Sequence, residues 1–401
     1  MTSPSTPTPA PDASARRVFR ANPAYDVVPF DRLTTRDQAT IAEFARDPDF
    51  FGILRPRSES TGTIKAVSRN VALLIYSLQT PGTIPRQAVA GGDGSIVDAV
   101  WRLTLDGVLE VERDGVFVSG ADALADSATR ASQGAVARLS HDALRLIARI
   151  EGEDPLALAD RLYHFNRRPL TPRWGARIST PGDVLRFVGA STNSHTTSAL
   201  SRHWKTKATD VGEYWLSWWP RVTSRNPRRS ADDQVTYKLY VSPKTEMLPD
   251  VFPAVVDVLV DAGAPPFKIG ASASAILRPD KLVAYFTRRT AAEEVASAIA
   301  SEVGETTAQP VPFTHELAGD GLVSLGIDPP SSRALLSQVG SSWRQWVCRR
   351  LASYVATAQR TGRSRDADRF ALERVTLDGI DPSTWEPSED AVRGFAADTS
   401  T

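Results

Sequence analysis

Residues 235–289 read VTYKLYVSPKTEMLPDVFPAVVDVLVDAGAPPFKIGASASAILRPDKLVAYFTRR, and this stretch decides the fold of the C-terminal part of the chain. The segments 235–243, 264–272 and 278–289 are short and rich in β-branched and aromatic residues, which is typical of strands. Between the first two, 247–263 places apolar residues at helical spacing and ends at a glycine, which predicts a helix. Strands that alternate with helices indicate an α/β or α+β sheet domain.

The residues after this stretch continue the same pattern. We expect a helix over 291–304, a glycine-rich loop with strand character over 311–330, and an amphipathic helix over 341–360. The sheet domain is therefore predicted to span 231–375. An acidic, turn-rich tail is expected over 376–401.

Residues 126–230 are predicted to form a mostly helical connecting region. One helix is expected to begin after a cap at Ser140, and another to run from Asp154 to a stop at Pro169. The tryptophan-rich segment GEYWLSWWPR, 212–221, is interpreted as a buried helix that packs two domains together. NPRRSADDQ, 226–234, has the composition of a linker or an exposed loop.

The N-terminal part is predicted to be a winged helix with an added β-hairpin, over 21–125. FFGILRPR and GTIKAV indicate two strands of a hairpin, and SRNVALLIYSL and SIVDAVWRLTLDG indicate two amphipathic helices. Alternating apolar residues around Asp114-Gly115 predict a second hairpin as the wing. Residues 1–20 are rich in Pro, Ser and Thr, and we expect a disordered leader there. The predicted class is α+β, multidomain.

Composition excludes several classes of protein. The chain has 401 residues, more than one core usually organises, and its 47 cationic residues balance 47 acidic ones, which gives no general case for nucleic acid. No apolar run of about 18 residues predicts a membrane span. The single cysteine, Cys348, excludes an internal disulfide and suggests a cytoplasmic protein, and we interpret it as a core residue. Nucleotide-binding and hydrolase motifs are missing, and the five histidines lack metal-ligand spacing, so we expect no cofactor and no metal.

The lysines of the chain are clustered. Six of the seven lie between Lys205 and Lys281, among arginines and tyrosines of the predicted sheet domain. Such a cationic set suits the elimination of phosphate from phosphoserine or phosphothreonine, which needs a base for the Cα proton and cations for the phosphate. Lys268 fits the base best, because it stands in an apolar strand where burial can lower its pKa. A lysine that points to solvent from a half-exposed strand is the alternative, and the commoner case.

The N-terminal pattern ILRPR, IKAVSRNVALLIYSL and SIVDAVWRLTLDGVLEVE resembles the PqqD-like modules that recognise precursor peptides in ribosomal peptide pathways. The resemblance covers about 75 residues and implies that a leader peptide adds as a strand to an exposed sheet edge. We place this edge in the hairpin 51–67. The alternatives are a winged helix that only packs against its neighbour and one that binds DNA, although Arg102 is the one cation of its second helix.

The segments KLYVSP, PFKIGASASAILRPDKLVAYFTRR and VPFTHELAGDGLVSLGIDPP resemble the HopA-type effector family. Members of this family in lanthipeptide and thioamitide pathways act with a kinase as phospho-Ser/Thr lyases. The resemblance spans about 95 residues, and the chain departs from it at His315, where lysine is usual, and in the following loop. The matching positions are Lys268, Arg278 with Asp280, Tyr285, and Arg288 with Arg289.

The sequence therefore predicts a peptide-maturation protein that holds a precursor leader peptide and eliminates phosphate, with a kinase as its partner protein and neither nucleic acid nor a membrane. Lys268 is the expected base and His315 the expected acid for the leaving phosphate. A non-catalytic adaptor for precursor peptide and kinase is the main alternative, and a winged-helix regulator a weaker one. The expected phosphate-binding residues are Lys238, Arg278, Lys281 and Arg288.

Overall fold

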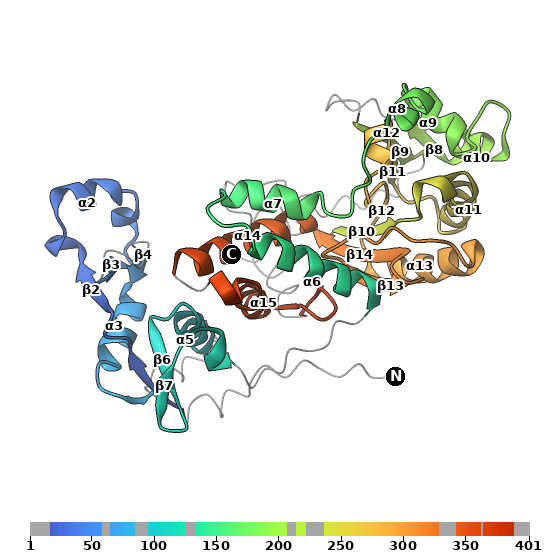
Figure 1. Ribbon diagram of the computed structural model, residues 1–401. Coiled ribbons are helices and arrows are strands. Elements are labelled where there is room, and N and C mark those ends of the chain that lie inside the picture. Colours follow the sequence, from blue (N-terminus) through green and yellow to red (C-terminus); the bar gives the residue numbers. More distant parts are fainter. Residues whose placement is uncertain are drawn as a thin grey trace. The chain divides into compact units, whose positions relative to one another are not determined.

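A computed structural model describes residues 17–57, 65–84, 95–124, 134–206, 214–221, 236–328, 342–361 and 364–388. The fold is mixed α+β with several sheets (Figure 1). It separates into two compact units. The N-terminal unit holds residues 1–130, 148–152 and 353–378, and the C-terminal unit holds 131–147, 153–352 and 379–401. Residues 1–16 of the leader expected over 1–20, the linker at 226–234 and residues 389–401 of the tail expected over 376–401 lie outside the described residues. Residues 18–20 belong to a strand, so the expected disorder is wrong for them, and 380–387 contain two short strands of the tail.

The N-terminal unit contains two small antiparallel sheets. One has the order β5-β1-β6-β7 and the other β2-β3-β4. A core that includes Phe19, Leu54, Trp101 and Val111 lies between these strands and the two main helices. The elements are β1 (Val18–Ala21), β2 (Tyr25–Pro29), α2 (Thr35–Thr40), β3 (Phe50–Pro56), β4 (Lys65–Ser68), α3 (Arg69–Ser77), β5 (Gly82–Thr83), α5 (Ser95–Leu105), β6 (Leu109–Arg113), β7 (Val116–Val118) and α15 (Ala367–Leu377).

Local sequence signals in this unit are confirmed. Ser68 caps α3, since its side chain accepts a hydrogen bond from the backbone N–H of Val71. The turn between β6 and β7 has positive φ at both Asp114 and Gly115, as a two-residue hairpin turn requires. The hairpin of β3 and β4 also forms, but β2 pairs with the other side of β3. Within 51–67, β3 is therefore the central strand of its sheet and β4 is an edge strand, so the predicted docking edge can only be β4 and stays a prediction.

The C-terminal unit contains one seven-stranded sheet with the order β13-β14-β10-β12-β11-β9-β8, in which every pair is antiparallel. Its elements are α6 (Gly134–Ala148), α7 (Pro155–Tyr163), α8 (Pro172–Arg177), α9 (Pro181–Phe187), α10 (His195–His203), β8 (Trp204–Thr206), β9 (Trp215–Pro220), β10 (Thr236–Val241), α11 (Leu248–Asp261), β11 (Phe267–Gly270), α12 (Ala273–Ile276), β12 (Leu282–Phe286), α13 (Arg289–Val303), β13 (His315–Ala318), β14 (Val323–Asp328), the first part of α14 (Trp343–Arg360), β15 (Ile380–Asp381) and β16 (Glu386–Pro387). The second part of α14, from residue 353 on, is counted in the N-terminal unit.

One face of the sheet packs against α11 and α13, which Figure 1 shows beside the strands. Leu239, Phe267, Ala284 and Leu325 from four adjacent strands join the apolar side chains of these helices in the largest core. The three predicted strands and the helix between them in 235–289 are confirmed. The other face is also largely covered, since Tyr240, Val283 and Ser324 are buried there, and its polar side chains lie among these buried residues.

Two predictions for 126–230 are wrong. Ser140 does not begin a helix but lies inside α6, where its hydroxyl donates to the Val136 carbonyl and accepts from the Phe313 N–H. Within the segment 212–221, residues Trp215–Pro220 form strand β9 and not a helix, and β9 and β8 belong to the seven-stranded sheet. The spacing of the three tryptophans also fits a helix. In the strand, Trp218 is buried on one face, while Trp219 is exposed on the other.

Candidate functional site

Strand register places the candidate residues on the sheet face opposite α11 and α13. Lys238 of β10 lies opposite Tyr285 of β12, and Lys268 of β11 lies opposite Val283 of β12. Lys268 also lies opposite Ser217 of β9. Since opposed residues share a face and alternate residues of a strand do too, both lysines and Tyr285 project from the same side. We call this side the polar face.

Lys268 is only partly buried, and its ammonium group lies over aromatic rings. Nζ is 4.0 Å from the centre of the Trp215 ring and 5.8 Å from that of Tyr285. Burial lowers the pKa of Lys268 to about 8, and the charges of Lys238 and Arg278 add to this effect, while Asp280 opposes it. On the order of a tenth of the Lys268 side chains are therefore neutral at pH 7. A neutral amine can accept a proton, so Lys268 can act as a base without a second residue that deprotonates it.

Lys238 and Tyr285 lie next to Lys268 on the polar face. Lys238 forms an ion pair with Asp328, and its Nζ is 5.7 Å from the centre of the Tyr285 ring. Burial, helped by the negative charge of Asp328, raises the pKa of the Tyr285 hydroxyl well above its ordinary value. Tyr285 is thus a protonated hydrogen-bond donor at neutral pH, between two lysines.

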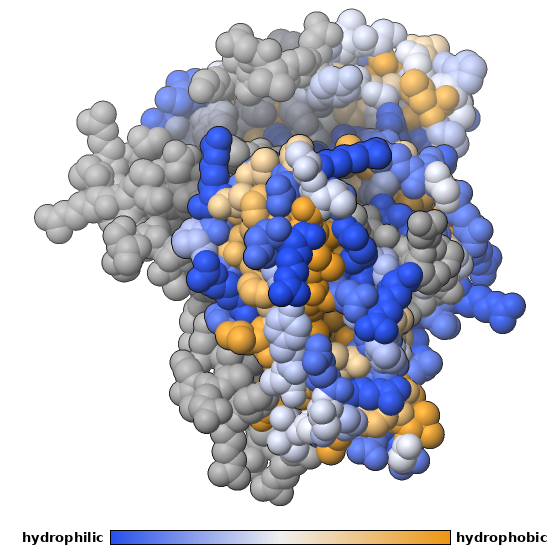
Figure 2. All heavy atoms as spheres, turned by 90° about the vertical axis from the view of Figure 1, so that its left-hand side faces the viewer, coloured by the Kyte–Doolittle hydropathy of each residue, from blue (hydrophilic) through white to orange (hydrophobic). Residues whose placement is uncertain are grey.

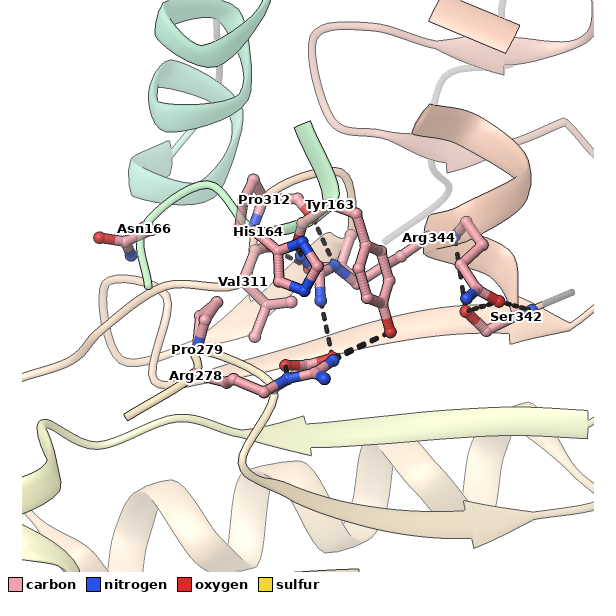
Figure 3. A network of polar contacts seen from close by, with 12 residues as sticks. Tyr163, His164, Asn166, Arg278, Pro279, Val311, Pro312, Ser342 and Arg344 are labelled. Carbon is pink, nitrogen blue, oxygen red and sulfur yellow. Dashed lines mark hydrogen bonds and ion pairs between the residues drawn. The ribbon is translucent and has the colours of Figure 1, made fainter. Parts of the chain in front are cut away.

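Arg278 is oriented by a buried network (Figure 3). Its Nε and Nη2 donate to the carboxylate of Asp280 at 2.9 and 2.8 Å, and Nη2 also donates to the Tyr163 hydroxyl at 3.0 Å. Within the described part of the chain these contacts leave Nη1 unused. Two edges of the guanidinium are fixed, so that the third can meet an anion in one orientation.

Asp280 is the centre of this network. Its side chain is 6% exposed and also contacts Arg344, whose Nη1 lies 2.8 Å away in an ion pair without the angle of a hydrogen bond. Arg344 is held in turn by the backbone carbonyls of Pro312 and Tyr163. Burial alone would raise the pKa of Asp280, but the two arginines outweigh it and hold the pKa below its usual range. Asp280 is therefore an anion and not an acid.

Two of the expected phosphate ligands lie outside this arrangement. Lys281 is fully buried, and its Nζ donates to the Pro243 carbonyl and to Gln309 Oε1, both at 2.8 Å. Burial lowers its pKa to about 7, and the two acceptors give it a structural position between loops. Arg288 is exposed immediately before α13 and forms no ion pair with the described residues. Neither joins Lys238, Lys268 and Arg278.

His315 does not share a face with Lys268. It lies opposite Leu325, whose side chain belongs to the core against α11 and α13. Its Nε2 is 3.7 Å from the Glu386 carboxylate, and its Nδ1 is 3.4 Å from the Thr384 carbonyl. The period of two along a strand puts His315 on the reverse of the sheet, so the structure does not bring the expected acid to the expected base.

No sequence pattern marks Tyr163, Arg344 or Trp215 as parts of the site. Tyr163 ends α7 and Arg344 begins α14, and each looks like an ordinary residue of an amphipathic helix. Trp215 was assigned to a helix that is in fact β9. Cys348, in contrast, is a buried core residue as predicted, and burial raises the pKa of its thiol to about 12.

The N-terminal unit has a separate apolar groove of about 590 Å³. Phe50 and Phe51 of β3 line it together with Leu73 and Tyr76 of α3, and Leu73 is 66% exposed. Figure 2 shows apolar residues gathered on this face. Large exposed apolar residues that form one surface usually mark an interaction site.

The described residues contain no group of three His, Cys, Asp or Glu side chains that could hold a metal ion. Among the helices of the described ranges, none combines the length and the apolar character that crossing a membrane requires.

No family model matches the chain, and no curated protein matches it. The solved structures that resemble it include effector proteins from Pseudomonas syringae pathovar tomato and pathovar syringae. The first is 12% identical with a TM-score of 0.37, and the second is 11% identical with a TM-score of 0.38. Each similarity covers 63% of this chain, and 98% and 99% of the respective effector chains.

Proposed function

We propose that the chain matures a ribosomal precursor peptide by eliminating phosphate from phosphoserine or phosphothreonine, which leaves a dehydroamino acid. The observation that carries the proposal is Lys268, an amine with a pKa of about 8 that shares the polar face with Lys238. Lys268 and Arg278 also lie over the same ring, since their Nζ and Cζ are 4.0 and 5.6 Å from the centre of Trp215. Four cations, with Arg344, face two carboxylates, those of Asp280 and Asp328, so the surplus charge is positive. A dianionic phosphoryl group complements this surplus.

The reaction follows from the positions of the groups. Neutral Lys268 takes the Cα proton, and the electrons of the C–H bond form the Cα=Cβ double bond. The Cβ–O bond breaks, and its electrons leave with the phosphate. The unused Nη1 of Arg278 and the ammonium of Lys238 stabilise the charge that collects on the phosphate oxygens. Protonated Lys268 then returns its proton to water.

Tyr285 replaces His315 in this proposal as the donor to the leaving oxygen. Its hydroxyl is protonated at neutral pH, and its ring lies within 6 Å of both lysine ammonium groups. His315 belongs to the other face of the sheet. Because a phosphate bound by two cations leaves readily, loss of the Tyr285 hydroxyl is expected to slow turnover less than loss of Lys268.

The N-terminal unit is proposed to hold the leader of the same precursor peptide. Its support is the apolar groove between β3 and α3, which has room for several side chains of a peptide. The Tyr76 hydroxyl donates to the Val27 carbonyl on β2, so side-chain docking in the groove is favoured over strand addition beside Val27. The winged-helix character of 21–125 and the lyase-like character of 231–375 remain part of this proposal, as does a kinase that supplies the phosphate.

The rival function is a non-catalytic adaptor that binds precursor peptide and kinase, and a winged-helix regulator is the third. Incubation with a synthetic phosphopeptide, followed by mass spectrometry, separates them. We expect the parent protein to remove the mass of phosphoric acid from the peptide, and Lys268→Ala to slow this about 10²–10⁴-fold. Lys244→Ala is the matched control, because Lys244 is an exposed lysine of the same unit that lies outside the strands of the sheet. An unchanged peptide mass with the parent protein would favour the adaptor.

A further inference from the structure

The polar face continues from Lys268 to the edge of the sheet. Ser217 lies opposite Lys268, and two residues further along β9 stands Trp219, opposite Lys205 of the edge strand β8. Strand alternation therefore puts Trp219 on the same face as Lys268. With about 3.3 Å per residue along a strand and about 4.8 Å between strands, the backbones of these two residues are roughly 8 Å apart.

Trp219 differs sharply from its neighbour in the strand. Trp218 is 4% exposed and stacks on Phe267 at 4.8 Å, whereas Trp219 is 45% exposed. Trp215, the third tryptophan, already lies under the ammonium of Lys268. Trp219 is thus a large aromatic surface with its ring partly open to solvent, one step from the proposed base. Tryptophan in such a position is typical of residues that anchor a bound chain.

We propose that Trp219 binds an apolar side chain of the substrate, two or three residues from the phosphorylated one. This inference rests on the proposed function and names its substrate class, a phosphorylated peptide with an apolar neighbour. An extended peptide advances about 3.3 Å per residue, so this separation spans the distance from Lys268 to Trp219. The exposed ammonium of Lys205 beside Trp219 adds positive charge to that end of the track, which complements an anionic peptide.

Binding is measured in a Lys268→Ala background, so that the peptide is not consumed. A fluorescent phosphopeptide carries leucine at the second and third positions on both sides of phosphoserine, and a matched peptide carries alanine there. Fluorescence polarisation then gives the dissociation constants. We expect Trp219→Ala to weaken binding of the leucine peptide about tenfold and to leave the alanine peptide unchanged, and Trp219→Phe to restore most of the loss.

Tyr214→Ala is the matched control, because Tyr214 is an aromatic residue 64% exposed just before β9. The Tyr214→Ala variant should bind both peptides with the same dissociation constants as the Lys268→Ala protein from which it is made. Equal affinity of the parent and Trp219→Ala for the leucine peptide would overturn the inference, as would a concentration-dependent dimer that Trp219→Ala abolishes. Failure of the proposed function has another signature, since the protein with Lys268 intact would then bind the peptide but leave its mass unchanged.

Discussion

Replacement of Lys268 by methionine is expected to stabilise the fold while it slows the proposed elimination about 10²–10⁴-fold. Burial lowers the pKa of Lys268 from 10.5 to about 8. The difference of about 2.5 units corresponds to about 3 kcal/mol, at 1.36 kcal/mol per unit, by which the folded state disfavours the charged amine at pH 7. The cation–π contact of Nζ with the Trp215 ring at 4.0 Å stabilises the charged amine and offsets about 1–2 kcal/mol of this penalty. Lys268→Met should therefore raise the free energy of unfolding by about 1–2 kcal/mol.

The pH dependence of this gain has a defined sign. Below pH 8 the amine is charged in both the folded and the unfolded state, and the whole penalty is present. Between pH 8 and 10.5 the unfolded state binds more protons, so the parent becomes more stable as the pH rises. The advantage of Lys268→Met should accordingly shrink over this window.

Thermal unfolding followed by circular dichroism at about pH 7 and about pH 10 measures both effects. For a unit of this size, about 1–2 kcal/mol corresponds to a rise of roughly 2–8 °C in the melting temperature. Lys205→Met, at an exposed lysine of the same sheet, should change the free energy of unfolding by less than about 0.5 kcal/mol. If Lys268→Met unfolds below the parent at pH 7, the amine is stabilised in the fold, and its role as a base loses its physical support.

Three further changes test the site and the core. Asp280→Asn should lower the free energy of unfolding by about 3–5 kcal/mol in urea titrations, because Arg278 and Arg344 lose their shared buried carboxylate, and unchanged stability would contradict the network. Trp218→Ala should cost about 3–5 kcal/mol by the same assay, since it empties the stack on Phe267, and a loss below about 1 kcal/mol would mean that the stack is not part of the core. With a phosphopeptide substrate, kcat/KM should rise with pH through about 8 as free Lys268 loses its proton, and a flat profile from about pH 6 to 9 would exclude this base.

The elements that the sequence predicts well are those whose signals are local. The cap at Ser68, the positive-φ turn at Asp114-Gly115 and the alternation of strands and helix over 235–289 depend on a few consecutive residues. The tryptophan-rich strand β9 was missed because Trp215, Trp218 and Trp219 repeat at spacings of three and four, which also fit a helix. Only pairing with β11 shows that they alternate between the two faces.

The chemistry of the candidate site stays a prediction, whereas the residues that surround Lys268 are set by strand register and by packing. Lysine type and an apolar strand were enough to single out Lys268, since both are visible in the sequence. Which residue joins it depends on strand register, and one residue of shift moves a side chain to the other face, as His315 illustrates. Tyr163 and Arg344 reach Asp280 through loops and helix ends whose packing no short pattern encodes.

The buried network around Asp280 makes the anion site a product of late folding. Tyr163 and Arg278 are separated by 115 residues along the chain, and Arg344 bonds to the Tyr163 carbonyl across 181. Contacts of such long sequence separation close large loops and form slowly. Arg344 is the last of the three residues to be synthesised. In a nascent or truncated chain that ends before α14, Asp280 therefore lacks its ion pair with Arg344, and Arg278 is oriented by Asp280 and Tyr163 alone. The phosphate binding proposed for Arg278 is thus coupled to the formation of α14.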